Sequence, residues 1–287
     1  MWTMNSILDF IPKIPIAEGI KAFVDWITNV FAFIFNPIKV HFGNFMEFLA
    51  EDVLMPIPPI IVIIVIAVIA FFASKKKLGL PAFTILGLWL IYNQGHWNDL
   101  MNTVTLVLIA SILSIIIGVP IGILMSKSKT ANAIFSPILD FMQTMPAFVY
   151  LIPAVAFFGI GMVPGVFASL IFATPPTVRF TNLGIRQVPK ELVEAADAFG
   201  STGFQKLMKV ELPVAKATIM AGINQTVMLA LSMVVIASMI GAPGLGNAVL
   251  SSLQRAQVGP GFVAGIGIVI LAIIIDRITQ NLNKKND

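Results

Sequence analysis

Residues 190–213 read KELVEAADAFGSTGFQKLMKVELP, a charged and helix-prone stretch that lies between two long uncharged runs. Those runs, residues 141–178 and 217–254, contain no Asp, Glu, Lys or Arg. Only 11% of the 287 residues are charged, whereas a soluble domain has about 25% charged residues. So few charged side chains cannot cover the surface of a protein folded in water. The composition therefore predicts an all-α polytopic membrane protein.

Seven segments are apolar and long enough to be predicted as membrane-spanning helices, each of which needs about 20 residues. Gly and Pro divide both long uncharged runs, at 159–165 and at 241–246, because these residues interrupt helices. The piece after the second break, NAVLSSLQ, is too short and too polar to cross. The predicted spans are residues 53–74, 78–98, 100–126, the two parts of 141–178, the first part of 217–254, and 256–275.

The segment before residue 53 is predicted to lie along the membrane rather than to cross it. Residues 22–35 are rich in aromatic side chains, but Asp25 interrupts them and the uncharged run that follows is short. We therefore expect an interfacial amphipathic helix within residues 1–52. The first residues lack the basic region and the apolar core of a signal peptide.

The distribution of basic residues predicts the orientation of the spans. With residues 190–213 placed in the cytoplasm, fourteen of the 18 Lys and Arg residues lie on that side, including residues 75–77. The four on the other side are Lys13, Lys21, Lys39 and Arg255. Because basic residues accumulate in cytoplasmic loops, we expect a multi-pass protein with its N-terminus outside and its C-terminus inside. The net charge of +4 is explained by this bias, not by nucleic acid binding.

The stretch from residue 189 to residue 200 has the pattern of a short amphipathic helix. Pro189 suits the first helical position, where its missing N–H costs nothing. Gly200 supplies a C-terminal stop. One narrow apolar stripe is expected, with spacing i, i+3, i+4 and i+7, formed by Leu192, Ala195, Ala196 and Phe199. Small side chains in the stripe allow another surface to approach closely.

A second helix is predicted to follow at once. Thr202 and Gln205 form a T-x-x-Q capping box at its start. Leu212 and Pro213 should end it, since the residue before a proline avoids the α conformation. By physical pattern alone, this helix–turn–helix is either a solvated loop packed on its own bundle or a docking element for a cytoplasmic partner.

The spacing of seven residues resembles the EAA signature of bacterial ABC importer permeases. That signature runs Glu-Ala-Ala, three residues, Gly, nine residues, hydrophobic-x-Leu-Pro, and it is matched by Glu194, Ala195, Ala196, Gly200, Val210, Leu212 and Pro213. The resemblance implies a coupling helix seated in a cleft of an ATP-binding subunit. It implies ATPase-coupling roles for Glu194, Ala195, Ala196, Phe199, Gly200, Leu212 and Pro213.

The resemblance also implies an architecture and a set of partners. A five-helix type I ABC importer permease core is expected over residues 99–280, with a cytoplasmic coupling loop at 179–216. The remaining parts are an external segment at 1–52, two additional transmembrane helices at 53–98 and a cytoplasmic tail at 281–287. The implied partners are a second copy of the chain, two ATP-binding subunits, a separate extracytoplasmic binding protein, and membrane lipid of anionic type.

No nucleotide-binding loop of the form G-x-x-x-x-G-K-[ST] occurs in the sequence. The chain is therefore predicted to carry no cofactor and no catalytic residue and not to be an enzyme, with ATP and Mg²⁺ on the partner ATPase. The sequence has no Cys, and His41 and His96 are isolated, so no metal site is expected.

The sequences of three stretches are similar to those of permeases of glycine betaine/proline betaine importers. These stretches are residues 139–179, EAADAFGST, and residues 230–246. The resemblance implies import of compatible solutes by alternating access, in the bacterial cytoplasmic membrane, for osmoprotection. Two alternatives stay open: an ABC importer permease for methionine, a sulfonate or another small solute, and a transporter that works without ATP.

Candidates for the translocation path are aromatic and polar side chains in the predicted spans. Aromatic faces attract a quaternary ammonium by cation–π contact, and polar side chains form weak walls. The candidates are Gln143, Thr144, Phe148, Tyr150, Asn224 and Ser232, with Gln225 as a further polar residue. The competing interpretation is that the rings pack helices or face lipid and that the polar groups form interhelical hydrogen bonds.

Overall fold

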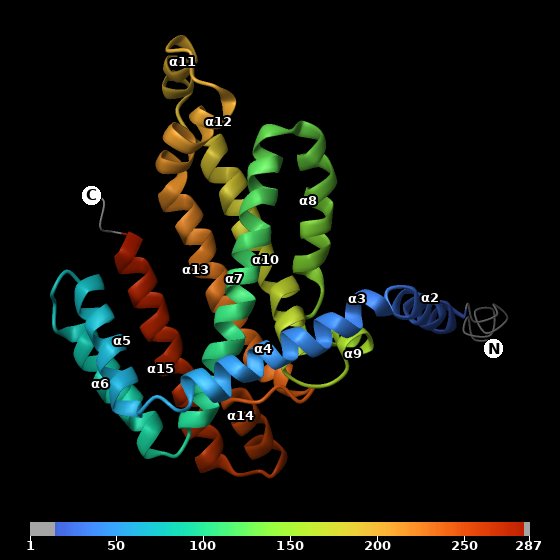
Figure 1. Ribbon diagram of the computed structural model, residues 1–287, viewed down its shortest axis with the longest axis vertical. Helices are drawn as coiled ribbons and strands as arrows, with labels where there is room; N and C mark the ends of the chain where they lie inside the picture. Colours follow the sequence, from blue (N-terminus) through green and yellow to red (C-terminus); the bar gives the residue numbers. More distant parts are fainter. Residues whose placement is uncertain (1–14, 284–287) are drawn as a thin grey trace, which may run out of the picture.

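A computed structural model of the protein describes residues 15–283, and every element in this range is a helix (Figure 1). The predicted all-α fold class is confirmed. Two predictions rest on residues outside the described range. The first is that the N-terminal residues are not a signal peptide. The second is the side of the membrane on which Lys13, Lys284 and Lys285 lie.

The N-terminal segment is a chain of short helices that runs across the lower part of the molecule, transverse to the long helices (Figure 1). Its elements are α2 (Ile16–Val30), α3 (Ala32–Pro37), π-helical η1 (Ile38–Phe42), α4 (Gly43–Glu47) and π-helical η2 (Phe48–Leu54). Residues 32–54 make an angle of 96° with the next helix, α5 (Pro59–Ala73). α2 contains no buried residue, and it exposes Ile16, Ile20, Phe23 and Trp26. Its position at a membrane interface stays a prediction.

Three long helices form the centre of the molecule: α7 (Trp97–Lys127), α10 (Met162–Arg186) and α13 (Leu212–Ser238). Small residues let them approach closely, as in many membrane proteins. A Cβ atom added to Gly122 of α7 would lie 2.6 Å from Cβ of Thr181 on α10. A Cβ atom added to Gly222 of α13 would lie 2.5 Å from Cβ of Phe180.

A polar bridge also joins α10 to α13 near their middle. The hydroxyl groups of Thr177 and Thr226 lie 2.7 Å apart, and the Thr226 hydroxyl donates to the Ala173 carbonyl at 2.8 Å. Both threonines are fully buried. Inside an apolar bundle such paired groups stabilise one relative position of the two helices.

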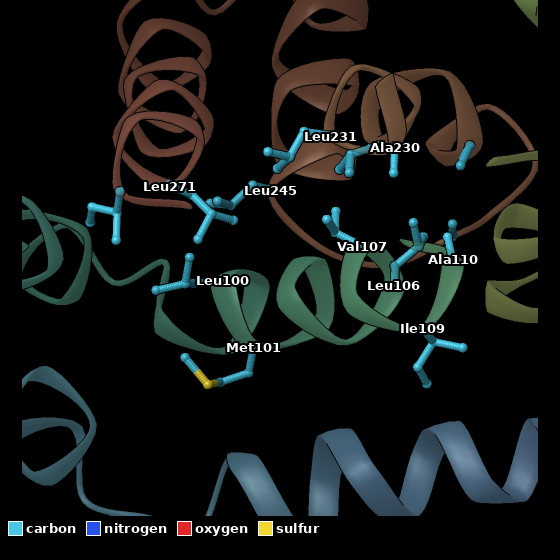
Figure 2. Close-up of a cluster of buried hydrophobic side chains, with 14 of the residues drawn as sticks. Leu100, Met101, Leu106, Val107, Ile109, Ala110, Ala230, Leu231, Leu245 and Leu271 are labelled. Carbon is cyan, nitrogen blue, oxygen red and sulfur yellow. The ribbon is translucent and has the colours of Figure 1, made fainter. Parts of the chain in front are cut away.

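The largest hydrophobic core lies where α7 meets α13, α14 (Leu245–Gln254) and α15 (Val258–Asn283). Figure 2 shows Leu100, Leu231, Leu245 and Leu271 gathered there from these four helices. α5 and α6 (Gly79–Asn93) pack on each other and on α15 at one side of the bundle (Figure 1). On the other side lie α8 (Lys129–Thr144), the 3-10 segment η3 (Ala147–Tyr150) and α9 (Leu151–Phe158).

The helix breaks predicted from Gly and Pro occur, and a further sharp bend lies inside the fourth predicted span. α9 ends at Phe158 and α10 begins at Met162, with positive φ angles at Gly159 and Gly161. The fourth predicted span, however, is divided at Met145 and Pro146. Pro146 has an extended backbone there, and the two halves meet at 109°.

By length and composition, three helices in the described range could each cross a membrane: residues 97–127, 203–238 and 258–281. Two bent pairs, residues 32–73 and 129–158, raise this number to five if each pair is one span. The two other predicted spans correspond to α6, which has 15 residues, and α10, which has 25 residues. Arg179, Pro175 and Pro176 lie inside α10, and Arg186 is its last residue. The full count of seven therefore stays a prediction.

Candidate coupling segment and translocation pathway

The stretch between α10 and α13 contains the predicted first helix. α11 (Lys190–Ala198) follows Pro189, which lies at the N-cap and not inside the helix as predicted. Gly200 has φ +74°, and the N–H groups of Gly200 and Ser201 donate to the carbonyls of Asp197 and Ala196. Such a left-handed residue ends a helix, so the predicted role of Gly200 as a stop is confirmed.

The second helix begins as predicted but ends differently. At the start of α12 (Gly203–Lys206), Thr202 and Gln205 form both hydrogen bonds of a capping box, at 2.9 and 3.3 Å. The predicted end at Leu212 and Pro213 is wrong, because the helix continues from Gly203 to Ser238.

A change of hydrogen-bond register explains this continuity. The π-helical segment η4 (Leu207–Glu211) lies between α12 and α13. Its hydrogen bonds run i→i+5. Pro213 lies in the first turn of α13, directly after this segment, where the change of register removes the need for its N–H. The coupling segment, residues 189–211, is thus joined to α13 by continuous helix.

The apolar stripe of α11 is mostly uncovered by the described part of the chain, and only Ala196 in it is half-buried. Phe199 is 91% exposed and Leu192 is 45% exposed, and no residue of α11 is buried. Only Val193, off the stripe, packs on a hydrophobic cluster that includes Val188 and Ala215. Two further apolar side chains of the segment, Phe204 and Met208, are also exposed. This is the arrangement of a helix that offers an apolar face to another surface.

Ion pairs hold the coupling segment in place. Lys206 Nζ donates to both carboxylate oxygens of Asp197, at 2.7 and 2.9 Å, and so ties α12 to α11. Lys127, in the last turn of α7, forms an ion pair with Glu211. The Glu211 side chain is only 5% exposed, whereas the Lys127 side chain is 41% exposed. The segment is therefore linked to two of the central helices. It continues as a helix into α13, and the ion pair between Glu211 and Lys127 joins it to α7.

A groove of about 460 Å³ lies between α8, α10 and α13. Of the six predicted pathway residues, Gln143 alone lines it, together with the further polar residue Gln225. The other lining residues are Phe172, Pro176, Arg179, Phe180 and Leu229. Arg179 also donates a hydrogen bond to Asp140 of α8.

The other predicted pathway residues make local or interhelical hydrogen bonds. Thr144 and Ser232 donate to carbonyls of their own helices, those of Phe141 and Met228. The Asn224 amide donates to Asp276 of α15 at 2.7 Å. Asn224 thus forms an interhelical hydrogen bond, as the competing interpretation of the polar residues expects.

Two predicted aromatic residues also lie outside the lining. Phe148 is 58% exposed and Tyr150 is buried. The Tyr150 hydroxyl donates to the Met142 carbonyl, and its ring packs against Phe172. Tyr150 therefore supports a lining residue from behind.

Five lining residues were not predicted as pathway residues from the sequence, and Phe172, Arg179 and Phe180 are the aromatic and charged ones among them. Arg179 was counted only as one of the basic residues of the cytoplasmic side. A usable signal was its position, because Arg179 precedes the end of α10 by two helical turns. A charge at such depth indicates a functional or paired residue.

Comparisons with known proteins agree with this geometry. A family model for the binding-protein-dependent transport system inner membrane component matches residues 115–287. The glycine betaine/carnitine transport permease protein GbuB of Listeria monocytogenes is 59% identical over 96% of this chain and 98% of its own length. The glycine betaine transport system permease protein OpuAB of Bacillus subtilis is 52% identical over 97% of this chain and 98% of its own.

Solved structures show a similar fold. The inward-facing methionine ABC transporter MetNI has a chain with a TM-score of 0.60 and 20% identity, covering 68% of this chain and 95% of that one. A chain of an amino acid ABC transporter solved with histidines has a TM-score of 0.58 and 20% identity, covering 69% and 96%. At this identity the likeness concerns the fold alone.

Proposed function

This chain belongs to the family of binding-protein-dependent transport system inner membrane components, and we propose that it is the permease of an ATP-driven importer for glycine betaine and related quaternary ammonium solutes. The observation that carries the proposal is the exposed apolar stripe of α11 at the EAA positions. α11 itself lies at one end of the bundle (Figure 1). The substrate class is supported by relatives at 59% and 52% identity that are named as glycine betaine permeases.

In the proposed complex two copies of this chain pair, and an ATP-binding subunit docks on each α11. ATP and Mg²⁺ are held by those subunits, a separate binding protein delivers the solute outside, and the surrounding lipid is anionic. Closure of the motors moves α11, and the continuous helix from α12 to α13 carries that motion into the bundle. Import of a compatible solute in this way serves osmoprotection.

The proposed orientation has α11 and the C-terminus in the cytoplasm and the N-terminus outside. In its support, α11 and the turn between α7 and α8, with Lys127 and Lys129, lie at one end of the molecule (Figure 1). α14 lies at the other end, where Arg255 follows it. Basic residues concentrate on the cytoplasmic side of membrane proteins.

Uptake of labelled glycine betaine into proteoliposomes tests the class and the substrate together. The vesicles contain this chain with its ATP-binding subunit, and the loaded binding protein is added outside, with and without ATP inside. We expect uptake that needs ATP and that excess methionine does not reduce. Uptake without ATP would refute the ATP-driven importer. ATP-dependent uptake of methionine but not of glycine betaine would refute the substrate.

A substitution in α11 tests the docking surface. Ala195→Trp places a bulky ring in the apolar stripe, and we expect the ATP-binding subunit to dissociate from the complex during purification. Lys190→Trp is the matched control, because residue 190 is exposed but lies on the opposite side of α11. Gly200→Trp is less informative, since φ is +74° at Gly200 and any side chain there strains the turn itself. Equal retention of the subunit in both Trp variants would contradict the docking role.

A further inference from the structure

We propose that the groove between α8, α10 and α13 is a transient binding site for zwitterions that carry a carboxylate and a quaternary ammonium, with Arg179 as the carboxylate-binding residue. This inference rests on the proposed function and deepens it, because it names where in the membrane the solute is recognised. Nothing in the similarity to other proteins assigns a role to Arg179.

The first observation is the incomplete pairing of Arg179. Its terminal NH2 group donates to Oδ1 of Asp140, while its Nε–H is buried and has no acceptor in the described structure. The Asp140 side chain is 65% exposed and the Arg179 side chain 41% exposed. A half-exposed pair of this kind contributes about 0–1 kcal/mol. A ligand carboxylate can therefore replace Asp140 at little cost.

The geometry of the guanidinium favours that replacement. Arg binds carboxylates best through two parallel N–H···O bonds, and the contact with Asp140 uses one of its N–H groups. A small carboxylate that enters the groove can turn the guanidinium and engage two N–H groups at once. Asp140 is then a competitor that occupies Arg179 in the empty state, not a part of the ligand site.

The second observation is the pair of aromatic rings in the same groove. Phe172 and Phe180 line it with Arg179. A quaternary ammonium has no N–H to donate, so aromatic faces are the groups that recognise it, with about 1–2 kcal/mol per contact when desolvated. Amide groups of Gln143 and Gln225 complete the polar part of the lining.

Both rings are held from behind. The Tyr150 ring lies edge-on against Phe172 with centroids 6.2 Å apart, and the Tyr150 hydroxyl is fixed on a backbone carbonyl. Phe180 packs against the backbone of α13 at Gly222, where a Cβ atom would lie 2.5 Å from Cβ of Phe180. Rings positioned in this way form a wall of fixed shape, which a binding site requires.

The groove is thus complementary to both ends of a betaine. A betaine with its carboxylate at Arg179 and its ammonium against the rings would occupy part of a groove of about 460 Å³, a volume within the range of small-molecule sites. Choline lacks the carboxylate, and acetate lacks the ammonium, so each should bind more weakly than glycine betaine. Weak binding suits a pathway, because the solute must leave again.

Saturation-transfer NMR on the purified permease–ATPase complex, without the binding protein, tests the site directly. We expect a signal for glycine betaine that is at least fivefold larger than the signals for choline and acetate at equal concentration. Arg179→Gln should abolish the betaine signal, and Arg179→Lys should retain part of it because the charge remains. Arg186→Gln, which removes the same charge from the same helix outside the groove, should leave the signal unchanged.

Asp140→Asn separates recognition from a structural role. If the ion pair only fastens α8 to α10, Asp140→Asn and Arg179→Gln should reduce the betaine signal alike, and the proposal is overturned. If Arg179 binds the ligand, Asp140→Asn leaves a signal equal to or larger than that of the unmodified complex. Equal signals for choline and betaine would also overturn it. ATP-dependent uptake by the unmodified complex is measured in parallel, so a failure of the proposed function is recognised separately.

Discussion

The central interface of α7, α10 and α13 and the coupling segment use apolar and small residues in opposite ways. At the centre, Gly122 and Gly222 have no room for a Cβ atom, and Val178 and Val234 are fully or almost fully buried. In the coupling segment, Phe199 is 91% exposed, and a Cβ atom at Gly200 would meet nothing within 4 Å.

This contrast separates residues that stabilise the chain itself from residues that are available to a partner. Residues of the central interface contact one another, so their substitution should destabilise the isolated chain. The stripe of α11 contacts little within the chain, so its substitution should alter only what happens in the complex. Stability and coupled transport can therefore be separated by experiment, region by region.

The largest effect is expected at Gly122. A leucine there would place Cβ 2.6 Å from Cβ of Thr181 and 2.7 Å from the Val178 carbonyl oxygen, which belongs to the backbone and cannot turn away. We expect Gly122→Leu to lower the free energy of unfolding by about 3 kcal/mol or more. Thermal unfolding of the purified complex in detergent measures this.

Gly265→Leu is the control for Gly122→Leu. Gly265 lies inside α15, and a Cβ atom there would meet nothing within 4 Å. Leucine is also a better helix former than glycine, by up to about 1 kcal/mol. If both variants unfolded at the same temperature as the unmodified complex, the central helices would not be tightly packed at Gly122.

A smaller effect is expected where the two regions meet, at the ion pair between Lys127 and Glu211. Removing the lysine with Lys127→Met leaves a carboxylate that is only 5% exposed without its partner. We expect a loss of about 2 kcal/mol in the free energy of unfolding, below the full cost of a deeply buried pair because the lysine is half-exposed.

Removal of the other partner of this ion pair should cost less. Glu211→Gln leaves a lysine that is 41% exposed and can turn to water. Its cost should therefore be about 1 kcal/mol or less. The double variant should resemble Glu211→Gln, because no buried charge then remains unpaired. Equal costs for the two single variants would mean that Glu211 is hydrated and that the pair does not fasten the segment to α7.

The coupling segment was predictable from the sequence to the extent that its geometry is local. Gly200 and the pair Thr202–Gln205 act through neighbours within four residues, so their pattern determines the turn between α11 and α12. The end at Pro213 was predicted wrongly, because the π-helical segment before it changes the hydrogen-bond register and the sequence rules for proline assume a regular α-helix.

The groove was predictable only in part, because it is assembled from helices far apart in the sequence. Gln143 and Gln225 were identified by polarity alone. Arg179, Phe172 and Phe180 were missed, since their contribution depends on which side of α10 faces α8 and α13. Asn224 was expected beside the pathway, but its amide lies toward Asp276 on α15. The composition of a helix does not determine how that helix is rotated about its axis, and this rotation decides which side chains face the groove.

The smallest effect on stability, together with a clear effect on function, is expected at Phe199. Its side chain is 91% exposed, so Phe199→Ala should change the free energy of unfolding by no more than about 0.5 kcal/mol. In the proposed complex the same ring enters a cleft of the ATP-binding subunit, where the loss of one anchoring aromatic side chain costs about 1.4 kcal/mol or more. ATP-dependent uptake should accordingly fall about tenfold.

Phe262→Ala provides the matched control, because Phe262 is 70% exposed and lies near the start of α15. α15 begins beside α14, at the end of the molecule opposite α11 (Figure 1). It should change neither unfolding nor uptake by a measurable amount. If Phe199→Ala lowered the unfolding temperature as Gly122→Leu does, the ring would belong to this chain's own packing. If it left uptake at the level of Phe262→Ala, the exposed stripe would not be the surface through which the motor acts.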